Sequence, residues 1–527
     1  MQILTFVGFT LFVAILSYLK SRKTSEATSD GYFLEGRSLT ATVVAGSLLL
    51  TNLSTEQIVG SNGAAFKEGI LVMAWETLAA LAMVITALYL LPRYLTGGIT
   101  TIPQFLERRY DRFTKTLTSL LFLSGYVFVL LPIVLYSGAL AISNMFNVPE
   151  LLGISDTAAL WVMVFAIGII GSIYAVFGGL KTVAVSDTIN AIGLLIGGLL
   201  IPIFGLLAIG EGDVVSGLTR LVAEHPEKFN ALGGENASVP FGTIFTGMLL
   251  VNLFYWGTNQ AIIQRALGAK NLKEGQKGLL LAAFIKILGP LIVVLPGIIA
   301  FHMFGDTLNN PDAAYPTLIT KVLPASLVGF FAAVLFGAIL SSFNSALNSS
   351  ITLFGIDIYK SYLNKNASER ETVWAGKRFG IVLAFFAMIV APLIAYAPDG
   401  LFGYLQKVNG CYSIPILTII VIGYFTKYVP ALAAKIAMFS GVILYLAYIL
   451  LDSFVLKDTF PHYLHVMAIL FVFNAILMLI IGKIKPQLVP YEPYLSQMVS
   501  VRPWKFVVPI GITITVMVVG VYMYFSR

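Results

Sequence analysis

Long apolar stretches, separated by short polar ones, repeat along the whole of this chain. Many of them reach the roughly 18–20 residues that an α-helix needs to cross the hydrocarbon core of a bilayer. The pattern predicts an all-α, polytopic membrane protein with fourteen transmembrane helices. Their expected bounds are about 3–19, 40–65, 69–92, 116–145, 157–179, 183–210, 241–263, 278–302, 323–357, 379–397, 400–426, 430–451, 462–482 and 506–525.

Composition agrees with a membrane location and excludes an ordinary soluble domain. Of the 527 residues, 58% are hydrophobic and only 11% are charged, and the mean hydropathy is +0.88. Soluble domains carry about 25% charged residues. The single cysteine, Cys411, cannot form a disulfide within the chain. The net charge of +7 does not indicate a nucleic-acid partner, because in a membrane protein the location of the charges matters more than their sum.

The basic residues predict how the chain is oriented in the bilayer. Loops on one side of the predicted spans hold 24 of the 33 Lys and Arg residues, and the loops and ends on the other side hold 6. The side rich in Lys and Arg should be cytoplasmic, so both termini are expected outside. The segment 3–19 has no basic residue ahead of it and is followed by "KSRK", which favours a first membrane helix over a signal peptide. No linker or charge run indicates a separate soluble domain.

A polar stretch, residues 51–57, interrupts the apolar span 40–65. On an unbroken helix the side chains of Asn52 and Ser54 would point about 200° apart and could not line one cavity. If the helix is interrupted here, the two side chains can converge, and the carbonyls of Leu50 and Leu53 become free to bind a cation, as in transporters with broken helices. The alternative is that these polar groups hydrogen-bond to neighbouring helices.

Lys286 and Glu76 lie inside predicted spans, where a charge is costly unless it has a partner or a polar cavity. Lys286 lies roughly 12 Å from the cytoplasmic end of its span, which is too deep for easy contact with water. Pro290 and Pro296 are expected to bend the helix around it. Glu76 either reaches the headgroups at the outer end of its span or pairs with Lys286.

Small polar residues form a stripe in "GAILSSFNSALNSS", residues 337–350. The residues that share this helical face are Ala338, Ser341, Ser345 and Asn348. Together with Ser342 beside them, they offer hydroxyl and carbonyl oxygens, which suit a hard cation such as Na⁺. The alternative is a face of small residues that lets helices pack closely. Asp187 either completes a path for the cation or caps a helix start.

The motifs of several enzyme classes are missing from the sequence. It has no Walker A loop, no GxSxG and no HExxH, so neither ATP coupling nor hydrolytic chemistry is indicated. We therefore expect a protein that is not an enzyme and that uses no organic cofactor.

Six segments together carry a resemblance to a known family. They are "TNLSTEQIVG" (51–60), "IYAVFGGLKTVAVSDTIN" (173–190), "NLFYWGTNQAIIQRALGAKNLKEGQKG" (252–278), "AAFIKILGPLIVVLPGI" (282–298), "SSFNSALNSSITLFGIDIYK" (341–360) and "GLFGYLQKVNG" (400–410). From about residue 30 to 450 the chain resembles the sodium:solute symporter family, in particular the bacterial sodium/galactose cotransporter and, more distantly, the animal sodium/glucose cotransporters. The resemblance implies two inverted five-helix repeats with broken first helices, the fold of the leucine transporter type. The implied parts are 1–39 (an extra helix and a cytoplasmic loop), 40–210 (the first repeat), 211–426 (an outer loop and the second repeat) and 427–527 (three extra helices).

The resemblance also implies roles for individual residues. The implied substrate contacts are Asn52, Ser54, Gln57, Glu76, Asn252, Lys286 and Gln406. The implied gate residues are Tyr255, Phe402, Trp75 and Ser61. The implied sodium ligands are the carbonyls of Leu50, Leu53 and Ala338 and the hydroxyls of Ser341 and Ser342, with Asp187 on the sodium exit route. A second sodium site would need Asp187, Ser341, Ser345 and a hydroxyl at position 344, where this chain has Asn344, so the coupling ratio stays open.

The function implied by the resemblance is Na⁺-coupled symport of a neutral sugar or polyol, such as galactose or glucose, into the cell by alternating access. Ala79 stands where the galactose cotransporter has a serine, which leaves the particular sugar open. Other solutes that the family implies are sialic acid, inositol, amino acids and carboxylates, and a sodium-responsive sensor or a channel is a further alternative. The expected location is a plasma membrane, by resemblance the bacterial inner membrane, and the oligomeric state stays open.

Overall fold

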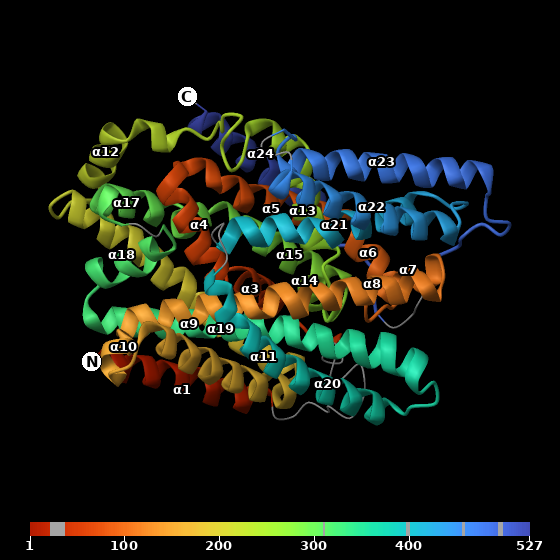
Figure 1. Ribbon diagram of the computed structural model, residues 1–527, viewed down its shortest axis with the longest axis horizontal. Coiled ribbons are helices and arrows are strands. Elements are labelled where there is room, and N and C mark those ends of the chain that lie inside the picture. The colour runs from red at the N-terminus through yellow and green to blue at the C-terminus, as the bar shows by residue number, and fades with distance from the viewer. Residues whose placement is uncertain (22–36, 309–310, 397–400, 456–458, 494–498, 527) are drawn as a thin grey trace.

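The computed structural model describes residues 1–21, 37–308, 311–396, 401–455, 459–493 and 499–526. Within these residues the fold is all-helical, with one isolated bridge between Leu39 and Ala269. Most of the helices run along the longest axis of the molecule and pack side by side (Figure 1). This confirms the prediction of an all-α chain.

The chain begins with α1 (Gln2–Ser21), which is followed by two helices that together cover the predicted second span. The helices of the first half are α3 (Ala41–Asn52), α4 (Thr55–Glu68), η2 (Gly69–Met73), α5 (Ala74–Ile85), η3 (Thr86–Leu90), α6 (Leu91–Gly97), α7 (Ile102–Arg109), α8 (Arg112–Gly125), η4 (Tyr126–Leu130), α9 (Leu131–Phe146), α10 (Val148–Leu152), α11 (Asp156–Ile209), α12 (Val214–Glu224) and η5 (Pro226–Phe229). The helices of the second half are η6 (Phe241–Phe245), α13 (Gly247–Gly257), α14 (Gln260–Leu267), α15 (Leu272–Ile287), α16 (Pro290–Val293), α17 (Leu295–Phe304), η7 (Gly305–Thr307), η8 (Pro311–Ala313), α18 (Ala314–Val322), α19 (Ala325–Thr352), η9 (Leu353–Leu363), α20 (Glu369–Val390), η10 (Ala391–Tyr396), α21 (Leu401–Phe425), α22 (Ala431–Phe454), α23 (Tyr463–Ile484) and α24 (Val507–Phe525).

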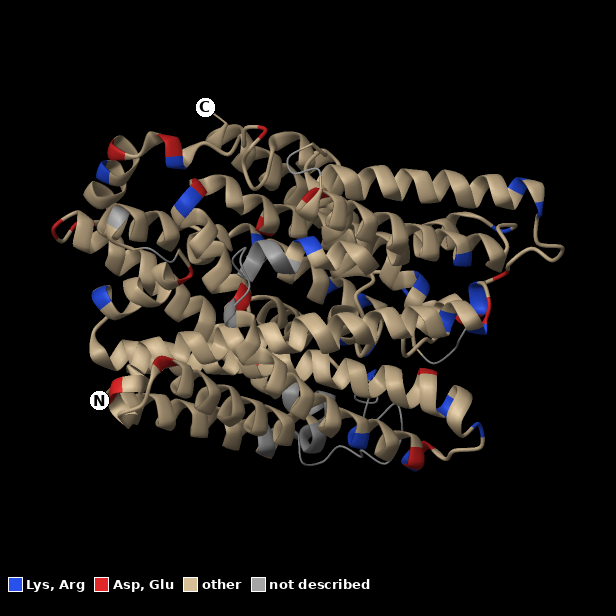
Figure 2. Ribbon diagram, viewed as in Figure 1, with Lys and Arg blue, Asp and Glu red and all other residues tan. Residues whose placement is uncertain are grey.

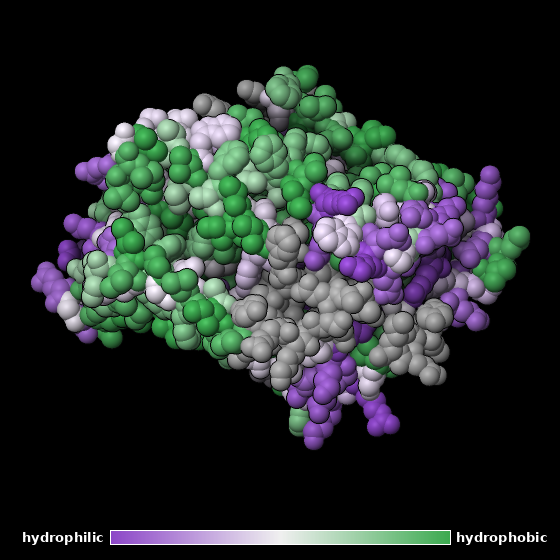
Figure 3. All heavy atoms as spheres, turned by 90° about the horizontal axis from the view of Figure 1, so that it is seen from below, coloured by the Kyte–Doolittle hydropathy of each residue, from purple (hydrophilic) through white to green (hydrophobic). Residues whose placement is uncertain are grey.

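The helices are long and apolar enough for a multi-pass membrane protein. Among the described residues, ten helices could each cross a membrane, or eleven if α15 and the α16–α17 segment, bent by 48°, form one span. The prediction of fourteen crossings also needs the shorter apolar helices Gln2–Leu16, Ala41–Asn52 and Gly247–Gly257 to be counted. On the face drawn in Figure 3, hydrophobic side chains cover much of the surface between more polar ends, as a lipid-facing surface requires.

Two helices are interrupted near the centre of the bundle. α3 ends at Asn52, Leu53 leaves the helical region (φ −76°, ψ 54°), and Ser54 is extended before α4 begins. The predicted interruption of the helix is therefore confirmed. In the second half of the chain, α13 ends at Gly257, and the extended Asn259 precedes α14.

The connection between α4 and η2 requires a glycine. Gly69 has a φ of +81°, and a Cβ at this position would lie 2.3 Å from the carbonyl oxygen of Lys228. Only glycine combines this backbone conformation with such a close approach. The loop segment η5 is thereby packed directly against the end of α4, where the Lys228 Nζ donates to the Phe66 carbonyl at 3.1 Å.

Both ends of the chain lie at one end of the bundle. The Ala231 N–H in the loop after α12 donates to the Phe525 carbonyl at 2.8 Å, and the backbone at Gly329, near the start of α19, closely approaches Gln2. Lys and Arg residues gather mainly toward the opposite end (Figure 2). The two termini therefore lie at the same end of the bundle. That this end faces the outside of the cell stays a prediction.

Candidate functional site

A polar cavity lies beside the interruption between α3 and α4. About 680 Å³ of space there is free of protein atoms, and this volume includes space open to solvent. The lining residues are Asn52, Glu56, Gln57, Trp75, Glu76, Ala79, Leu130, Val251, Asn252, Tyr255, Trp256, Asn259, Lys286, Gln406, Asn409 and Tyr412. Six of the seven predicted substrate contacts are thus brought together. The seventh, Ser54, does not line the cavity, and its hydroxyl lies 3.5 Å from the Asn52 carbonyl oxygen.

An ion pair between Glu76 on α5 and Lys286 on α15 forms one wall of the cavity. The Lys286 Nζ lies 2.5 Å from Glu76 Oε2, and both residues are only 1% exposed. The Gln57 Nε2 donates to the other carboxylate oxygen, Glu76 Oε1, at 3.0 Å. The structure confirms the predicted pairing, and the alternative in which Glu76 reaches the headgroups is wrong, because its carboxylate points into the bundle.

A second carboxylate, Glu56 on α4, also lines the cavity and was not predicted from the sequence. Glu56 is 6% exposed, and its Oε2 has no hydrogen-bond partner among the described residues. A buried acceptor without a partner is costly, so this atom favours a ligand that brings a hydroxyl or another donor.

Asn252 on α13 also lines the cavity, and its Nδ2 donates to the Met248 carbonyl at 3.0 Å.

Aromatic rings form the remaining walls of the cavity. The rings of Tyr255 and Trp256 meet edge to face at 5.3 Å, and the Lys286 Nζ lies 5.6 Å from the centre of the Trp256 ring. Of the predicted gate residues, Tyr255 and Trp75 line the cavity. Ser61 does not line it and instead accepts a hydrogen bond from the Gln57 Nε2 at 3.2 Å. The side chain of Phe402 lies outside the described residues.

The small polar stripe of α19 packs against the interruption in α3 and α4. The Ser342 hydroxyl donates to the Thr51 carbonyl at 3.0 Å. The Thr51 hydroxyl in turn lies 3.1 Å from the Ser345 hydroxyl and 3.4 Å from that of Ser341. The remaining predicted sodium ligands, which are all buried in the same region, are Leu50, Leu53 and Ala338. The stripe therefore lies against the backbone whose carbonyls the sequence identified as possible cation ligands.

Asp187 and Arg265 form a buried pair beside this stripe. The Arg265 Nη2 lies 3.7 Å from Asp187 Oδ2 and donates to the Ser345 hydroxyl, and each side chain of the ion pair is 1% exposed. Asp187 also accepts a hydrogen bond from Ser47 at 2.9 Å. Two sequence interpretations are corrected here. Asp187 lies within α11 rather than capping a helix. Arg265, which the predicted spans 241–263 and 278–302 leave in the loop between them, belongs to the buried helix α14.

Asn344 on α19 occupies the position at which a second sodium site would need a hydroxyl. Asn344 is fully buried, and both its Nδ2 and its Oδ1 lack hydrogen-bond partners among the described residues. The Oδ1 can act as an acceptor, but the Nδ2 can only donate. The position therefore keeps one possible cation ligand.

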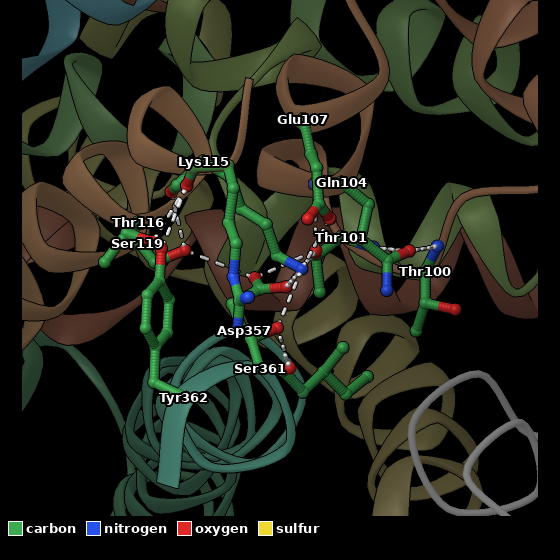
Figure 4. Close-up of polar contacts among 12 residues, drawn as sticks. Thr100, Thr101, Gln104, Glu107, Lys115, Thr116, Ser119, Asp357, Ser361 and Tyr362 are labelled. Atoms are coloured by element: carbon green, nitrogen blue, oxygen red, sulfur yellow. Dashed lines mark hydrogen bonds and ion pairs between the residues drawn. The ribbon is translucent and has the colours of Figure 1, made fainter. Parts of the chain in front are cut away.

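A third ionic cluster, partly buried and also missed by the sequence analysis, joins α7, α8 and η9 (Figure 4). The Lys115 Nζ lies 2.7 Å from Glu107 Oε2 and 3.4 Å from Asp357 Oδ1. The Asp357 carboxylate also accepts hydrogen bonds from Thr101 at 3.0 Å and from Ser119 at 3.3 Å. α7 lies toward the end of the bundle at which Lys and Arg residues gather (Figures 1 and 2), and no residue of this cluster lines the cavity.

Comparisons with known proteins agree with the resemblance seen in the sequence. Residues 32–441 match the model of the sodium:solute symporter family. The chain is 50% identical over 522 residues to the uncharacterized symporter YidK of Escherichia coli (strain K12), covering 99% of this chain and 90% of that protein. It is 32% identical over 461 residues to the sodium/glucose cotransporter of Vibrio parahaemolyticus, covering 82% and 83% of the two chains.

A solved structure has the same fold. It is a Na⁺-coupled sialic acid symporter in a substrate-bound, outward-open state, and it superposes with a TM-score of 0.78 at 19% sequence identity. The match covers 93% of this chain and 99% of that one. At this identity the structural likeness concerns the fold alone. The family match and the two relatives together show that the chain belongs to the sodium:solute symporter family.

Proposed function

We propose that the protein carries a neutral sugar or polyol into the cell together with Na⁺. The observation that supports the neutral substrate is the Glu76–Lys286 ion pair in the wall of the cavity. Because the ammonium group is already neutralised at 2.5 Å, the cavity presents no free cation among its described lining residues. It does present many hydrogen-bond donors and acceptors, which suit hydroxyl groups.

An anionic substrate, such as sialic acid or another carboxylate, fits this cavity less well. Such a ligand would need an unpaired cation, and the only described Lys or Arg in the cavity wall is the paired Lys286. The Glu56 Oε2 would in addition repel it while that carboxylate is ionised. The aromatic faces of Tyr255 and Trp256 favour a ligand with an apolar face, as a sugar ring has.

The coupling ion is proposed to bind between the α3–α4 interruption and the α19 stripe. The proposed ligands are the carbonyls of Leu50, Leu53 and Ala338 and the hydroxyls of Ser341 and Ser342. Oxygen ligands from freed carbonyls and hydroxyls suit Na⁺. Asp187 would lie on the exit route of the ion, next to Arg265. Thermodynamic linkage then requires that Na⁺ and substrate raise each other's affinity by the same factor.

The topology proposed for this function has fourteen crossings with both termini outside, in a plasma membrane of bacterial type. Two inverted repeats, 40–210 and 211–426, would each begin with one of the interrupted helices, α3–α4 and α13–α14. Alternating access would then move these helices relative to α19. An extra segment, 1–39, and three further helices, 427–527, would flank the repeats.

Uptake by the purified protein in sealed lipid vesicles tests the proposed function. An inward Na⁺ gradient should drive accumulation of a labelled neutral hexose or polyol, whereas a K⁺ gradient of the same size should not. Counterflow, in which unlabelled solute inside draws labelled solute in, separates a carrier from a channel or a sensor. Accumulation of a labelled carboxylate, with no effect of any neutral sugar, would contradict the proposed substrate class.

A further inference from the structure

Two of the four histidines of the chain meet a glutamate at the end of the bundle that holds the termini. Glu224 ends α12, His225 follows it directly, and His302 lies in α17, 77 residues further along the chain. The His225 Nε2 lies 3.2 Å from the His302 Nδ1, and this same Nδ1 lies 3.4 Å from Glu224 Oε2. One potential ligand atom from each residue therefore points into a common space, within 4.8 Å of the other two.

These separations match the geometry of a zinc site. Zn²⁺ binds imidazole nitrogen at about 2.0–2.1 Å and carboxylate oxygen at about 2.0–2.2 Å, in a tetrahedral arrangement. Two such ligands on one ion are then separated by roughly 3.3 Å. The distances of 3.2 Å and 3.4 Å agree with two edges of this tetrahedron. Imidazole and carboxylate are also ligand types that zinc accepts, whereas Mg²⁺ prefers oxygen ligands alone.

Neighbouring groups hold the three ligands in orientation. Glu227 Oε1 lies 3.6 Å from the Nδ1 of His225, on the ring nitrogen that would not contact the metal. Carboxylates in this position orient the imidazole and raise its basicity in metal sites. The Arg220 Nε holds the other oxygen of Glu224, Oε1, at 2.8 Å and leaves Oε2 facing His302. The His225 ring also packs against Phe301 at 5.2 Å.

Without a cation, the three side chains of this cluster cannot all pair with one another through hydrogen bonds. The Nδ1 of His302 can either accept from the His225 Nε2–H or, if it carries a proton, donate to Glu224. If this nitrogen accepts, it has no proton to give to the Glu224 carboxylate. If it is protonated, its single proton can go either to the His225 Nε2 or to Glu224 Oε2, but not to both. A metal ion between the three atoms removes the conflict, because every lone pair then points at the same positive charge.

We propose that Glu224, His225 and His302 bind one Zn²⁺ and that the metal fastens the loop after α12 to α17. The side chain of Glu224 is 44% exposed, so an ion can reach the site from the surrounding water, and a water molecule can complete the tetrahedron. α17 packs against α4, where the Gly297 N–H donates to Asn62 Oδ1 at 2.8 Å. The bound metal would therefore brace the helix that supports the outer part of the interrupted α3–α4 pair.

Zinc binding to the full-length protein in detergent tests this proposal, with ZnCl₂ as the probe and MgCl₂ as the metal control. Calorimetric titration should give one zinc ion per chain in the wild type and no response to magnesium. His302→Gln and Glu224→Gln should each weaken zinc binding by at least about tenfold, because each removes one ligand. A ligand that binds only the folded form also raises the apparent melting temperature, so zinc should raise it in the wild type and EDTA should reverse the rise.

His465→Gln is the matched control, because His465 is a histidine at another site, where its Nδ1 bonds to the Thr246 hydroxyl at 3.1 Å. This variant should keep the zinc affinity of the wild type. Unchanged affinity in both His302→Gln and Glu224→Gln would overturn the proposal, as would the absence of saturable zinc binding in the wild type. Glu224 is partly exposed, so Glu224→Gln remains informative if His302→Gln fails to fold.

Discussion

Removing one partner of the Glu76–Lys286 ion pair should destabilise the protein far more than removing both. Lys286→Gln would leave the Glu76 carboxylate, 1% exposed, without its cation. Breaking a buried ion pair in this way costs about 3–5 kcal/mol of folding free energy. The hydrogen bond from the Gln57 Nε2 to Glu76 Oε1 at 3.0 Å stays in place. We therefore expect a loss near the lower end, about 3 kcal/mol.

Glu76→Gln should cost a similar amount, because it leaves the Lys286 ammonium without its carboxylate. In the double variant both charges are gone, and two amides can hydrogen-bond to each other. The double variant should lose less free energy of unfolding than either single variant, so the two single losses together should exceed the double loss by more than about 3 kcal/mol. The assay is the free energy of unfolding of the wild type and the three variants in mixed micelles, followed by tryptophan fluorescence.

Strict additivity of the two single losses would refute this reasoning, because residues that interact directly must show a coupling energy. The same variants report on the substrate. Glu76→Gln should let the freed Lys286 charge attract carboxylate ligands, while both single variants should bind a neutral sugar more weakly. Unchanged affinity for the neutral sugar in both single variants would show that the pair does not line the substrate site.

Three further predictions concern the coupling ion, the packing of α17 and a helix cap. Ser341→Ala should lower the Na⁺ affinity, measured as the Na⁺ concentration for half-maximal uptake, and an unchanged value would remove Ser341 from the ion site. Gly297→Ala should destabilise the protein by about 1–3 kcal/mol in the same unfolding assay, because its Cβ would lie 2.2 Å from the Asn62 carbonyl oxygen. Equal stability would show that α17 and α4 can separate at no cost. Partial burial alone would raise the pKa of the Asp111 carboxyl, but hydrogen bonds from Lys435 and Thr114 lower that pKa below its ordinary value. The stabilisation by ionised Asp111 is then complete above about pH 4 and is lost as the pH falls through the lowered pKa. Melting temperatures across this range should therefore fall less steeply in Asp111→Asn than in the wild type, and equal slopes would contradict the assignment.

The local chemistry of the sequence left the interruption of α3–α4 open, and the family resemblance predicted it. The burial of the polar stripe followed from the local chemistry alone. A polar run in an apolar span and hydroxyls at helical spacing can both be recognised from the residues of a single helix. The pairing of Glu76 with Lys286 was also predictable, because few ionisable groups lie deep in the spans and a buried charge needs a partner.

Features that depend on contacts between distant helices escaped the sequence analysis. Arg265 lies just past an apolar run, and nothing in its neighbourhood indicates that α14 turns it inward toward Asp187. Glu56 stands among other polar residues, so its position in the cavity wall depends on where the helix restarts. The Lys115–Asp357 pair joins residues more than 200 positions apart at span ends, where charges are usually exposed to water. In each case the relative rotation of packed helices decides the contact, and the hydrophobic pattern does not specify that rotation.

The most direct test of the proposed function is the thermal stability of the purified wild-type protein across a panel of solutes. Each neutral hexose, inositol, sialic acid and amino acid would be added once in Na⁺ and once in K⁺. A ligand that binds only the folded form raises the apparent stability, so the substrate should raise the melting temperature. We predict that a neutral sugar or polyol raises it in Na⁺ and not in K⁺. Stabilisation by an acid or an amino acid but by no sugar, or by a sugar equally in both salts, would contradict sodium-coupled transport of a neutral sugar.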